Sequence, residues 1–512
     1  MLNVSRLTIR TTQDGFTLVD DLSFTLNAGE SFAIIGSEGA GKSTLLQAIH
    51  RCPTPHVDIT GDIRSHGKTA YLEQDVLATW RHETLLDFFV KTTPDEIPPP
   101  EAFERLADMK RRLNEVGFPD ASYDETRRLE SYSGGEIVKL AVAKLLLSDA
   151  DIFLLDEPTN DLDFETIVFL EDFIVSTDKA VLFISHDEAL LEATATGIIH
   201  LRRIMKRTRA ETAFLKCDYA SYVERFESDL ARQETLARKE RAEHRKKVER
   251  FRRIYQKVEH RQNQAVRDPE TARLLKKKIK SLKSTEKRYE KEKEGFIPIP
   301  EREEPVDLRF DPSLAFPKGK SVFELSLATL ERGGKTLSKN IELSVKGPEK
   351  IAIIGKNGVG KTTLLHAVHE HLKTRPGIRA GLMMQHYEDL APHASALTFL
   401  IGADADRQEE ARVRKMMGAL AFERNEMEQS PHALSGGQKA KLCLLKMVLE
   451  SNNVLLLDEP TRNLSPLSAP QIHRLLERFG GAIVCVTHDR RFIDNVFDTL
   501  YELTPAGLHK RA

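Results

Sequence analysis

Long hydrophobic runs and paired cysteines are both missing from this sequence. Of its 512 residues, 40% are hydrophobic and 30% are charged, and no run of 18 apolar residues occurs. Residues 1–12 alternate polar and apolar side chains as a strand does, so we expect no transmembrane helix, no membrane domain and no secretory signal. The four cysteines lie far apart without a CxxC pair, which argues against disulfides, a zinc site or an iron–sulfur cluster and fits a reducing cytosol. The length predicts two or three domains.

Net charge is also nearly absent, because 76 Lys and Arg balance 78 Asp and Glu to give −2. The stretch 231–294 breaks this balance with 23 basic and 11 acidic residues, a net charge of +12. A protein that is close to neutral but carries one cationic segment is a candidate for binding a polyanion. The alternative for this stretch alone is a solvated two-helix coil whose lysines only keep it in solution.

The same stretch predicts a helical hairpin. It contains one proline and no glycine, and its apolar residues recur at spacings of three, four and seven, which is typical of a coiled-coil seam. The seam residues are Val248, Phe251, Tyr255 and Val258 in the first arm and Leu275, Ile279, Leu282 and Tyr289 in the second. Asp268 is suited to cap the second arm and Pro269 to open it, so we expect the turn near residues 263–268.

The two regions that flank the hairpin repeat each other. Four motifs of the first region return in the second: GSEGAGKST (36–44) as GKNGVGKTT (355–363), SGGE (133–136) as SGGQ (435–438), IFLLDEPT (152–159) as VLLLDEPT (454–461), and ISHD (184–187) as VTHD (486–489). The last three pairs are each separated by 302 positions. Three motifs that keep one common offset indicate a duplicated domain.

Each region alternates short apolar runs with helical patterns, as parallel α/β sheets do. Strands are expected at Ser31–Ile35, Asp151–Leu155, Lys350–Ile354 and Asn453–Leu457. We therefore predict an α/β fold with two nucleotide-binding domains joined by a long α-helical hairpin linker. The predicted boundaries are 1–210 for the first domain, 211–300 for the basic linker, and 301–512 for an extended strap followed by the second domain.

The first repeated motif has the pattern and context of a P-loop, since it follows a strand and opens a helix. Its glycines let successive backbone N–H groups surround a phosphate at the start of the helix. Lys42 and Lys361 are placed to neutralise the β and γ phosphates of ATP. The predicted ATP-binding residues are Gly36, Ser37, Glu38, Gly39, Ala40, Gly41, Lys42, Ser43 and Thr44, and Gly355, Lys356, Asn357, Gly358, Val359, Gly360, Lys361, Thr362 and Thr363.

Carboxylates at the ends of two expected strands complete each site. Asp156 and Asp458, with the hydroxyls of Ser43 and Thr362, are predicted to hold Mg²⁺. The predicted catalytic residues are the bases Glu157 and Glu459, which polarise the attacking water, with His186 and His488 beside the γ-phosphate. Gln74 and Gln385, which follow further strands, are predicted to sense Mg²⁺ and that water.

A Ser-Gly-Gly helix start is a second phosphate-binding surface without a lysine. A P-loop site has no use for a second such surface in its own domain, which favours head-to-tail pairing of the two domains. The site of Lys42 would then be closed by Ser435, Gly436, Gly437 and Gln438. The site of Lys361 would be closed by Ser133, Gly134, Gly135 and Glu136.

This set of motifs resembles the ATP-binding-cassette (ABC) superfamily, and two cassettes with a charged helical linker resemble its ABC-F family. That resemblance implies a cytoplasmic ATPase, monomeric with intramolecular pairing of its cassettes, that acts on the ribosome in translation or in protection against antibiotics. It implies that the linker enters the tRNA exit site and that its tip, Asn263, Gln264, Ala265, Val266 and Arg267, contacts rRNA and the P-site tRNA. An aromatic residue commonly stacks on the adenine in this superfamily. Arg332 stands at that position in the second cassette, and Phe16 is the nearest aromatic residue in the first.

Two other functions remain open from the residues alone. A DNA-directed ATPase needs the same cationic hairpin, because DNA and RNA backbones present the same phosphates. A detached ATPase subunit of a membrane transporter needs two cassettes but leaves the hairpin unexplained.

Overall fold

The structure is a computed structural model that describes residues 1–13, 15–52, 54–98, 106–118, 123–159, 162, 164–204, 209–264, 269–292, 295–300, 308–385, 387, 390, 394–402, 405–462 and 464–511. It divides into two compact units, one formed by Met1–Tyr219 with Glu303–Ala512 and the other by Ala220–Arg302. We call residues 1–218 the first cassette and residues 308–511 the second cassette. Within the described residues, no helix combines the length and the apolar character needed to span a membrane.

The first cassette is built on a six-stranded sheet in the order β5-β6-β7-β3-β8-β9, with every neighbouring pair parallel except β8 and β9. Its strands are β3 (Ser31–Ile35), β5 (Thr69–Leu72), β6 (Ile152–Asp156), β7 (Ala180–Ile184), β8 (Gly197–Ile204) and β9 (Arg209–Leu215). A second, antiparallel sheet contains β1 (Leu2–Thr11), β2 (Thr17–Leu26) and β4 (Val57–Ser65). The central strands β3, β6 and β7 are buried along their whole length, as their continuous apolar sequences predict.

Helices cover these sheets. They are α1 (Lys42–His50), α2 (Val76–Trp80), α3 (Leu85–Val90), α4 (Leu106–Glu115), α5 (Gly134–Leu147), α6 (Phe164–Ser176) and α7 (Glu188–Thr194), with a 3₁₀ turn at Leu129–Ser131. One core cluster lies between the two sheets and α1, and includes Leu7, Ile34, Leu46 and Leu182.

The second cassette repeats this plan with the strand order β13-β14-β15-β12-β16-β17, in which β16 and β17 are antiparallel. Its strands are β10 (Lys320–Arg332), β11 (Lys335–Gly347), β12 (Lys350–Ile354), β13 (Ala380–Met383), β14 (Val454–Asp458), β15 (Ala482–Val486), β16 (Thr499–Thr504) and β17 (Gly507–Arg511). Its helices are α10 (Lys361–Lys373), α11 (Ala396–Ile401), α12 (Arg407–Ala419), α13 (Arg424–Glu428), α14 (Gly436–Leu449), α15 (Ala469–Glu477) and α16 (Arg490–Val496), with 3₁₀ turns at Pro312–Leu314 and Pro431–Ala433.

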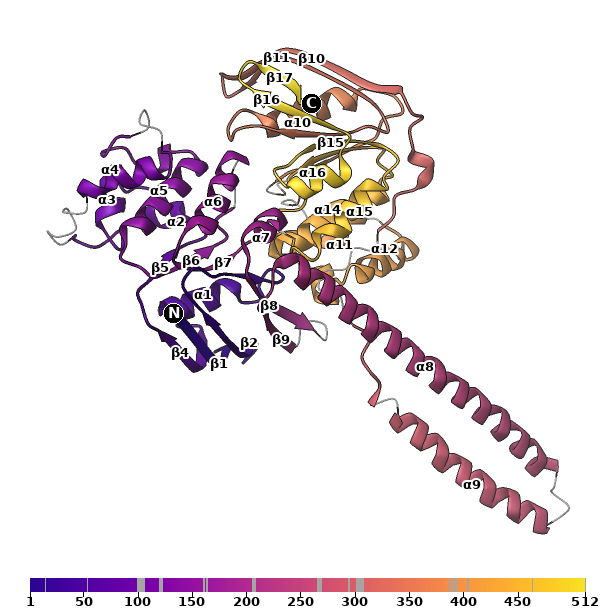
Figure 1. The fold of residues 1–512 in the computed structure, drawn as a ribbon. Helices are drawn as coiled ribbons and strands as arrows, with labels where there is room; N and C mark the ends of the chain where they lie inside the picture. The colour runs from indigo at the N-terminus through magenta and orange to yellow at the C-terminus, as the bar shows by residue number, and fades with distance from the viewer. Residues whose placement is uncertain are drawn as a thin grey trace. The chain divides into compact units, whose positions relative to one another are not determined.

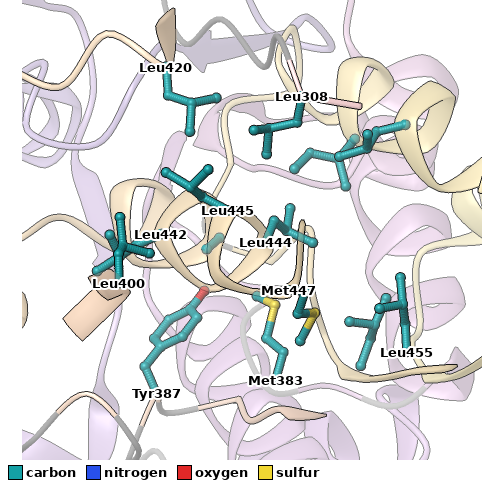
Figure 2. Packing of buried hydrophobic residues seen from close by; sticks show 14 of the residues in the cluster. Leu308, Met383, Tyr387, Leu400, Leu420, Leu442, Leu444, Leu445, Met447 and Leu455 are labelled. Atoms are coloured by element: carbon teal, nitrogen blue, oxygen red, sulfur yellow. The ribbon is translucent and has the colours of Figure 1, made fainter. Parts of the chain in front are cut away.

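The largest core of the second cassette surrounds α14. Figure 2 shows Leu442, Leu445 and Met447 of α14 gathered with Met383 of β13 and Leu455 of β14. The end of the strap that precedes the second cassette is part of the same core. Leu308 is buried in it, and the ring of Phe310 lies 4.5 Å from that of Phe479.

The unit Ala220–Arg302 holds the predicted helical hairpin. Helices α8 (Tyr219–Gln264) and α9 (Pro269–Glu292) run antiparallel (Figure 1). Phe251 of α8 packs edge to face on Tyr289 of α9 with ring centroids 5.9 Å apart, and His244 Nε2 lies 2.9 Å from the Tyr289 carbonyl. The predicted seam residues are buried or half-buried while their neighbours are exposed, which confirms the seam.

The sequence predictions of fold class and strand position are confirmed with small shifts. Pro269 opens α9 as predicted, while the turn residues 265–268 lie outside the described residues. Strands β6 and β14 each begin one residue later than expected and include Asp156 and Asp458. The two metal-binding candidates therefore belong to the strands themselves, where neighbouring strands fix the backbone.

Candidate nucleotide sites

The P-loop of the first cassette joins β3 to α1. Gly36 has a φ of 143°, and a Cβ atom there would lie 2.2 Å from the carbonyl oxygen of Leu201, so only glycine fits. Gly41 precedes the helix with a φ of 100°. The ammonium of Lys42 donates hydrogen bonds to the carbonyls of Gly36 (2.9 Å) and Ser37 (3.2 Å). The lysine is thereby folded back over its own loop, inside the ring of backbone groups that would surround a phosphate.

The P-loop of the second cassette has the same geometry between β12 and α10. Gly355 and Gly360 have φ values of 151° and 104°, and a Cβ atom on Gly355 would lie 2.4 Å from the Leu503 carbonyl oxygen. Lys361 donates to the carbonyl of Gly355 at 2.5 Å. All eighteen predicted loop residues therefore lie in two matching strand–loop–helix turns.

Each P-loop hydroxyl contacts the carboxylate at the end of β6 or β14, strands that are separated from the P-loop strands β3 and β12 by β7 and β15. Ser43 Oγ donates to Asp156 Oδ1 at 3.0 Å, and Thr362 Oγ1 donates to Asp458 Oδ2 at 2.6 Å. A hydroxyl beside a carboxylate provides the hard oxygen ligands that Mg²⁺ prefers, so these residues fit that ion. Burial is the main cause that raises the pKa of Asp156 above its ordinary value, although the bonds from Tyr71 and Ser43 oppose it.

Tyr71 is a residue that the sequence analysis did not find. It lies on β5, and its hydroxyl donates to Asp156 Oδ2 at 2.8 Å. The only sequence signal was a tyrosine inside a short, largely half-buried strand, since a hydroxyl shielded from water needs a polar partner. The identity of that partner depends on the register between β5 and β6.

The candidate bases follow directly after these aspartates. Glu157 and Glu459 have left-handed backbones with φ of 48° and 50°, a conformation that costs about 1–3 kcal/mol outside glycine. Their amides donate to the carbonyls of Ile184 (3.1 Å) and Val486 (2.9 Å) at the ends of β7 and β15. This left-handed turn places each glutamate directly after the carboxyl end of its strand.

The predicted glutamine and histidine of the first site both lie beside Glu157. Gln74 Nε2 donates to Glu157 Oε2 at 2.9 Å, and His186 Nε2 lies 3.4 Å from Glu157 Oε1. In the second site His488 Nε2 lies 3.9 Å from Glu459 Oε1. Burial, and next the charge of Asp458, raise the pKa of Glu459 to about 8.

The two Ser-Gly-Gly motifs begin α5 and α14. Ser133 and Ser435 are the N-cap residues, and each closes a capping box with Glu136 or Gln438. A Cβ atom on Gly135 would lie 2.6 Å from Thr166 Oγ1, so the close approach of α6 requires glycine there. Both motifs thus present helix N-termini with the polarity that suits a phosphate.

Contacts between the cassettes bring these motifs to the opposite P-loops. The Gly436 amide donates to Glu38 Oε2 at 2.5 Å, which joins the second Ser-Gly-Gly motif to the first P-loop. A cavity of about 480 Å³ is lined by Asn357, Gly358, Gly360, Lys361, Thr362, Thr363, Gln385, Asp458, Glu459 and His488 of the second cassette. Gly134 and His186 of the first cassette line the same cavity, as does Arg332 at the expected position of the adenine.

The predicted linker tip is only partly described. Asn263 and Gln264 form the end of α8. Their side chains, and all of Ala265, Val266 and Arg267, lie outside the described residues.

Comparisons with known proteins show which proteins this chain resembles. The family model for the ABC transporter matches residues 19–160 and 338–462. The chain is 29% identical to the ribosome protection protein VmlR of Bacillus subtilis (strain 168), over 97% of this chain and 85% of that protein. It is 26% identical to the ABC transporter F family member 2 of Arabidopsis thaliana, over 97% and 75%. The solved complex of archaeal ribosomal stalk protein aP1 and archaeal ribosome recycling factor aABCE1 has a TM-score of 0.61 at 15% identity, over 99% of this chain and 89% of that one, a likeness of fold alone.

Proposed function

Because the chain belongs to the ABC family, in its ABC-F branch, and is therefore an ATPase, we propose that it couples ATP hydrolysis to binding of the ribosome. The protein acts in the cytoplasm, either in translation or in protection of the ribosome against antibiotics. The ABC-F relative named as a ribosome protection protein supports the second of these roles. The protein acts as a monomer whose two cassettes pair within one chain.

The observation that carries this proposal is the cationic hairpin between the tandem cassettes. The stretch 231–294 has a net charge of +12, and α9 exposes Lys276, Lys277, Lys278 and Lys280 to solvent. Such a surface matches the phosphate backbone of rRNA and tRNA. By resemblance to the family, the hairpin enters the tRNA exit site with its tip, residues 263–267, toward the P-site tRNA.

The nucleotide chemistry follows from the two shared sites. Lys42 and Lys361 neutralise the β and γ phosphates, while each Ser-Gly-Gly helix start closes the site of the other cassette. Ser43 with Asp156, and Thr362 with Asp458, would hold Mg²⁺, which would supply positive charge to the phosphates, and Gln74 and Gln385 would sense the ion. Glu157 and Glu459 take a proton from the attacking water, and His186 and His488 hold that water and the γ-phosphate. Closure on ATP and release after hydrolysis then set when the hairpin binds.

The experiment that tests this proposal traps the ATP-bound state. The double variant Glu157→Gln with Glu459→Gln keeps the side-chain shape but removes both bases. With ATP and Mg²⁺ it is expected to co-sediment with ribosomes, whereas the wild type with ADP stays in the supernatant. Equal co-sedimentation of the two samples would contradict the proposal.

A charge-matched pair of variants tests the role of the hairpin. The triple variant Lys276→Glu, Lys277→Glu and Lys278→Glu is expected to abolish the co-sedimentation of the trapped variant with ribosomes. A control variant that replaces three exposed lysines of the second cassette by glutamate changes the net charge equally and is expected to leave the co-sedimentation intact. Those control positions are Lys318, Lys320 and Lys346. Competition with duplex DNA distinguishes this proposal from the alternative of a DNA-directed ATPase, because DNA would displace such an ATPase from ribosomes.

A further inference from the structure

Both oxygens of the Asp156 carboxylate receive a hydrogen bond. Ser43 donates to Oδ1 at 3.0 Å and Tyr71 donates to Oδ2 at 2.8 Å. The Asp156 residue is only 1% exposed, so water does not compete for either oxygen. Two donors from different elements, the P-loop helix α1 and the strand β5, therefore fix the orientation of this carboxylate.

Tyr71 is itself held rigidly. It packs against the core of the first cassette, and its ring stacks on His50 of α1 with centroids 5.6 Å apart. These contacts hold the Tyr71 hydroxyl in place as a donor to Asp156.

The second cassette has a different residue at this position. Tyr71 of β5 pairs with Leu154, two residues before Asp156, and Leu382 of β13 pairs with Leu456, two residues before Asp458. The register is therefore the same, but the leucine side chain has no polar atom. Leu382 instead packs against the apolar core of its own cassette. It cannot donate a hydrogen bond to Asp458.

We propose that Tyr71 is a positioning residue that holds Asp156 for Mg²⁺–nucleotide binding in the first site, through a hydrogen bond that Leu382 does not make in the second. The Tyr71 hydroxyl then lowers the free Mg²⁺ concentration at which the first site binds nucleotide. When the Ser43 hydroxyl turns to the ion, Tyr71 still holds Oδ2, so the carboxylate keeps its direction. Removal of such an outer-shell partner typically weakens metal binding about 10–100-fold. The inference rests on the role proposed above for Asp156 and not on ribosome binding.

The test measures nucleotide binding and not turnover. A fluorescent ATP analogue is titrated with Mg²⁺ in the full chain carrying Lys361→Ala, so that only the first site binds. Tyr71→Phe, which keeps the ring and removes the hydroxyl, is expected to raise the half-saturating Mg²⁺ concentration by about tenfold. The matched variant Leu382→Phe, in a chain carrying Lys42→Ala, is expected to cause no shift in the second site.

Two outcomes would overturn the inference, and they are distinguishable. If Asp156→Asn in the same background leaves the Mg²⁺ dependence unchanged, the role of Asp156 is wrong and that of Tyr71 fails with it. If Asp156→Asn shifts the dependence but Tyr71→Phe lowers only the melting temperature, the hydroxyl serves stability alone. A shift in both variants, with an unchanged Leu382→Phe variant, supports the inference.

Discussion

The two nucleotide sites agree closely in their P-loops and differ in what surrounds them. Gly36 and Gly355 have φ values of 143° and 151°, and Gly41 and Gly360 have 100° and 104°. Sterics force this agreement, because a carbonyl oxygen of the adjacent strand lies where a Cβ atom would be at both Gly36 and Gly355. The surrounding side chains face no such constraint, so the duplicated cassettes share a phosphate cradle and diverge in their control of it.

Helices α7 and α16, which contact each other between the two cassettes, carry opposite charges at an equivalent position. Glu188 of the first cassette and Arg490 of the second stand at equivalent positions, 302 residues apart. Arg490 Nη1 donates to both carboxylate oxygens of Glu171 at 3.1 Å, and Arg491 Nη1 donates to Glu188 Oε2 at 3.0 Å. Arg491 also pairs with Glu192. These opposite charges favour pairing of unlike cassettes over pairing of two identical ones.

Loss of a P-loop lysine is expected to have the largest effect. Lys42→Ala and Lys361→Ala should each weaken ATP binding at its own site by about 100-fold, because the phosphates lose a hydrogen-bonded positive charge. The measurement is photo-crosslinking of an ATP analogue, read separately on the two P-loop peptides. Glu165→Ala, which removes the exposed carboxylate 3.4 Å from Lys356, serves as the control and should change neither signal. If one variant lowers the crosslinking signal equally on both P-loop peptides, the assignment of one lysine to each site is wrong.

Charge exchange at the facing helices is expected to have the next largest effect. Arg490→Glu should weaken ATP-dependent pairing of the cassettes by about tenfold, and adding Glu171→Arg should restore most of it. Fluorescence energy transfer between labels on the two cassettes measures the pairing. Asp58→Lys, at an exposed position of β4, should have almost no effect. If the double variant pairs no better than Arg490→Glu alone, the ion pair does not act between these residues.

Glu188 is expected to make stability depend on pH. Burial, then the charge of Asp489, raise its pKa to about 7 from an ordinary value of 4.5, against the charges of His473 and Arg491. The folded state therefore retains a proton that the unfolded chain loses, so this contribution to stability is complete below about pH 4.5 and lost as the pH rises to about 7. The melting temperature should fall less between about pH 5 and pH 8 in Glu188→Gln than in the wild type. An equal fall in both proteins would exclude Glu188 as the cause, and Glu192→Gln is the matched control.

The smallest effect is expected at the edge of the first site. Arg203 lies over the ring of Phe16 at 4.7 Å and donates to the Gly39 carbonyl of the P-loop. Pro505, at the equivalent position 302 residues later, offers no such contact. Arg203→Ala should weaken ATP binding at the first site by about two- to fivefold, the value of one exposed cation–π contact. If an ATP titration shows that Arg203→Ala binds ATP at the first site as tightly as the wild type does, Arg203 does not distinguish the two sites.

The order of elements, the P-loop turns and the hairpin seam were all readable from the sequence, because local spacing determines them. Pro269 opened α9 as its fixed φ requires. Contacts that depend on the register between strands far apart in the sequence could not be predicted. Tyr71 meets Asp156, which lies 85 positions later, only through the pairing of β5 with β6. The contact of Arg490 with Glu171 was likewise not predictable, because the repeated motifs indicate that the cassettes pair but not which side chains meet.

Whether ATP closes the first P-loop against the second Ser-Gly-Gly motif can be measured directly by crosslinking. Cysteines at Glu38 and Gly436, in a chain without its four native cysteines, are treated with a short bifunctional thiol reagent. With ATP, Mg²⁺ and the Glu157→Gln and Glu459→Gln substitutions, a rapid crosslink within one chain is expected, and a slower one with ADP. A crosslink that forms equally with ADP, or only between two chains, would contradict this ATP-dependent closure.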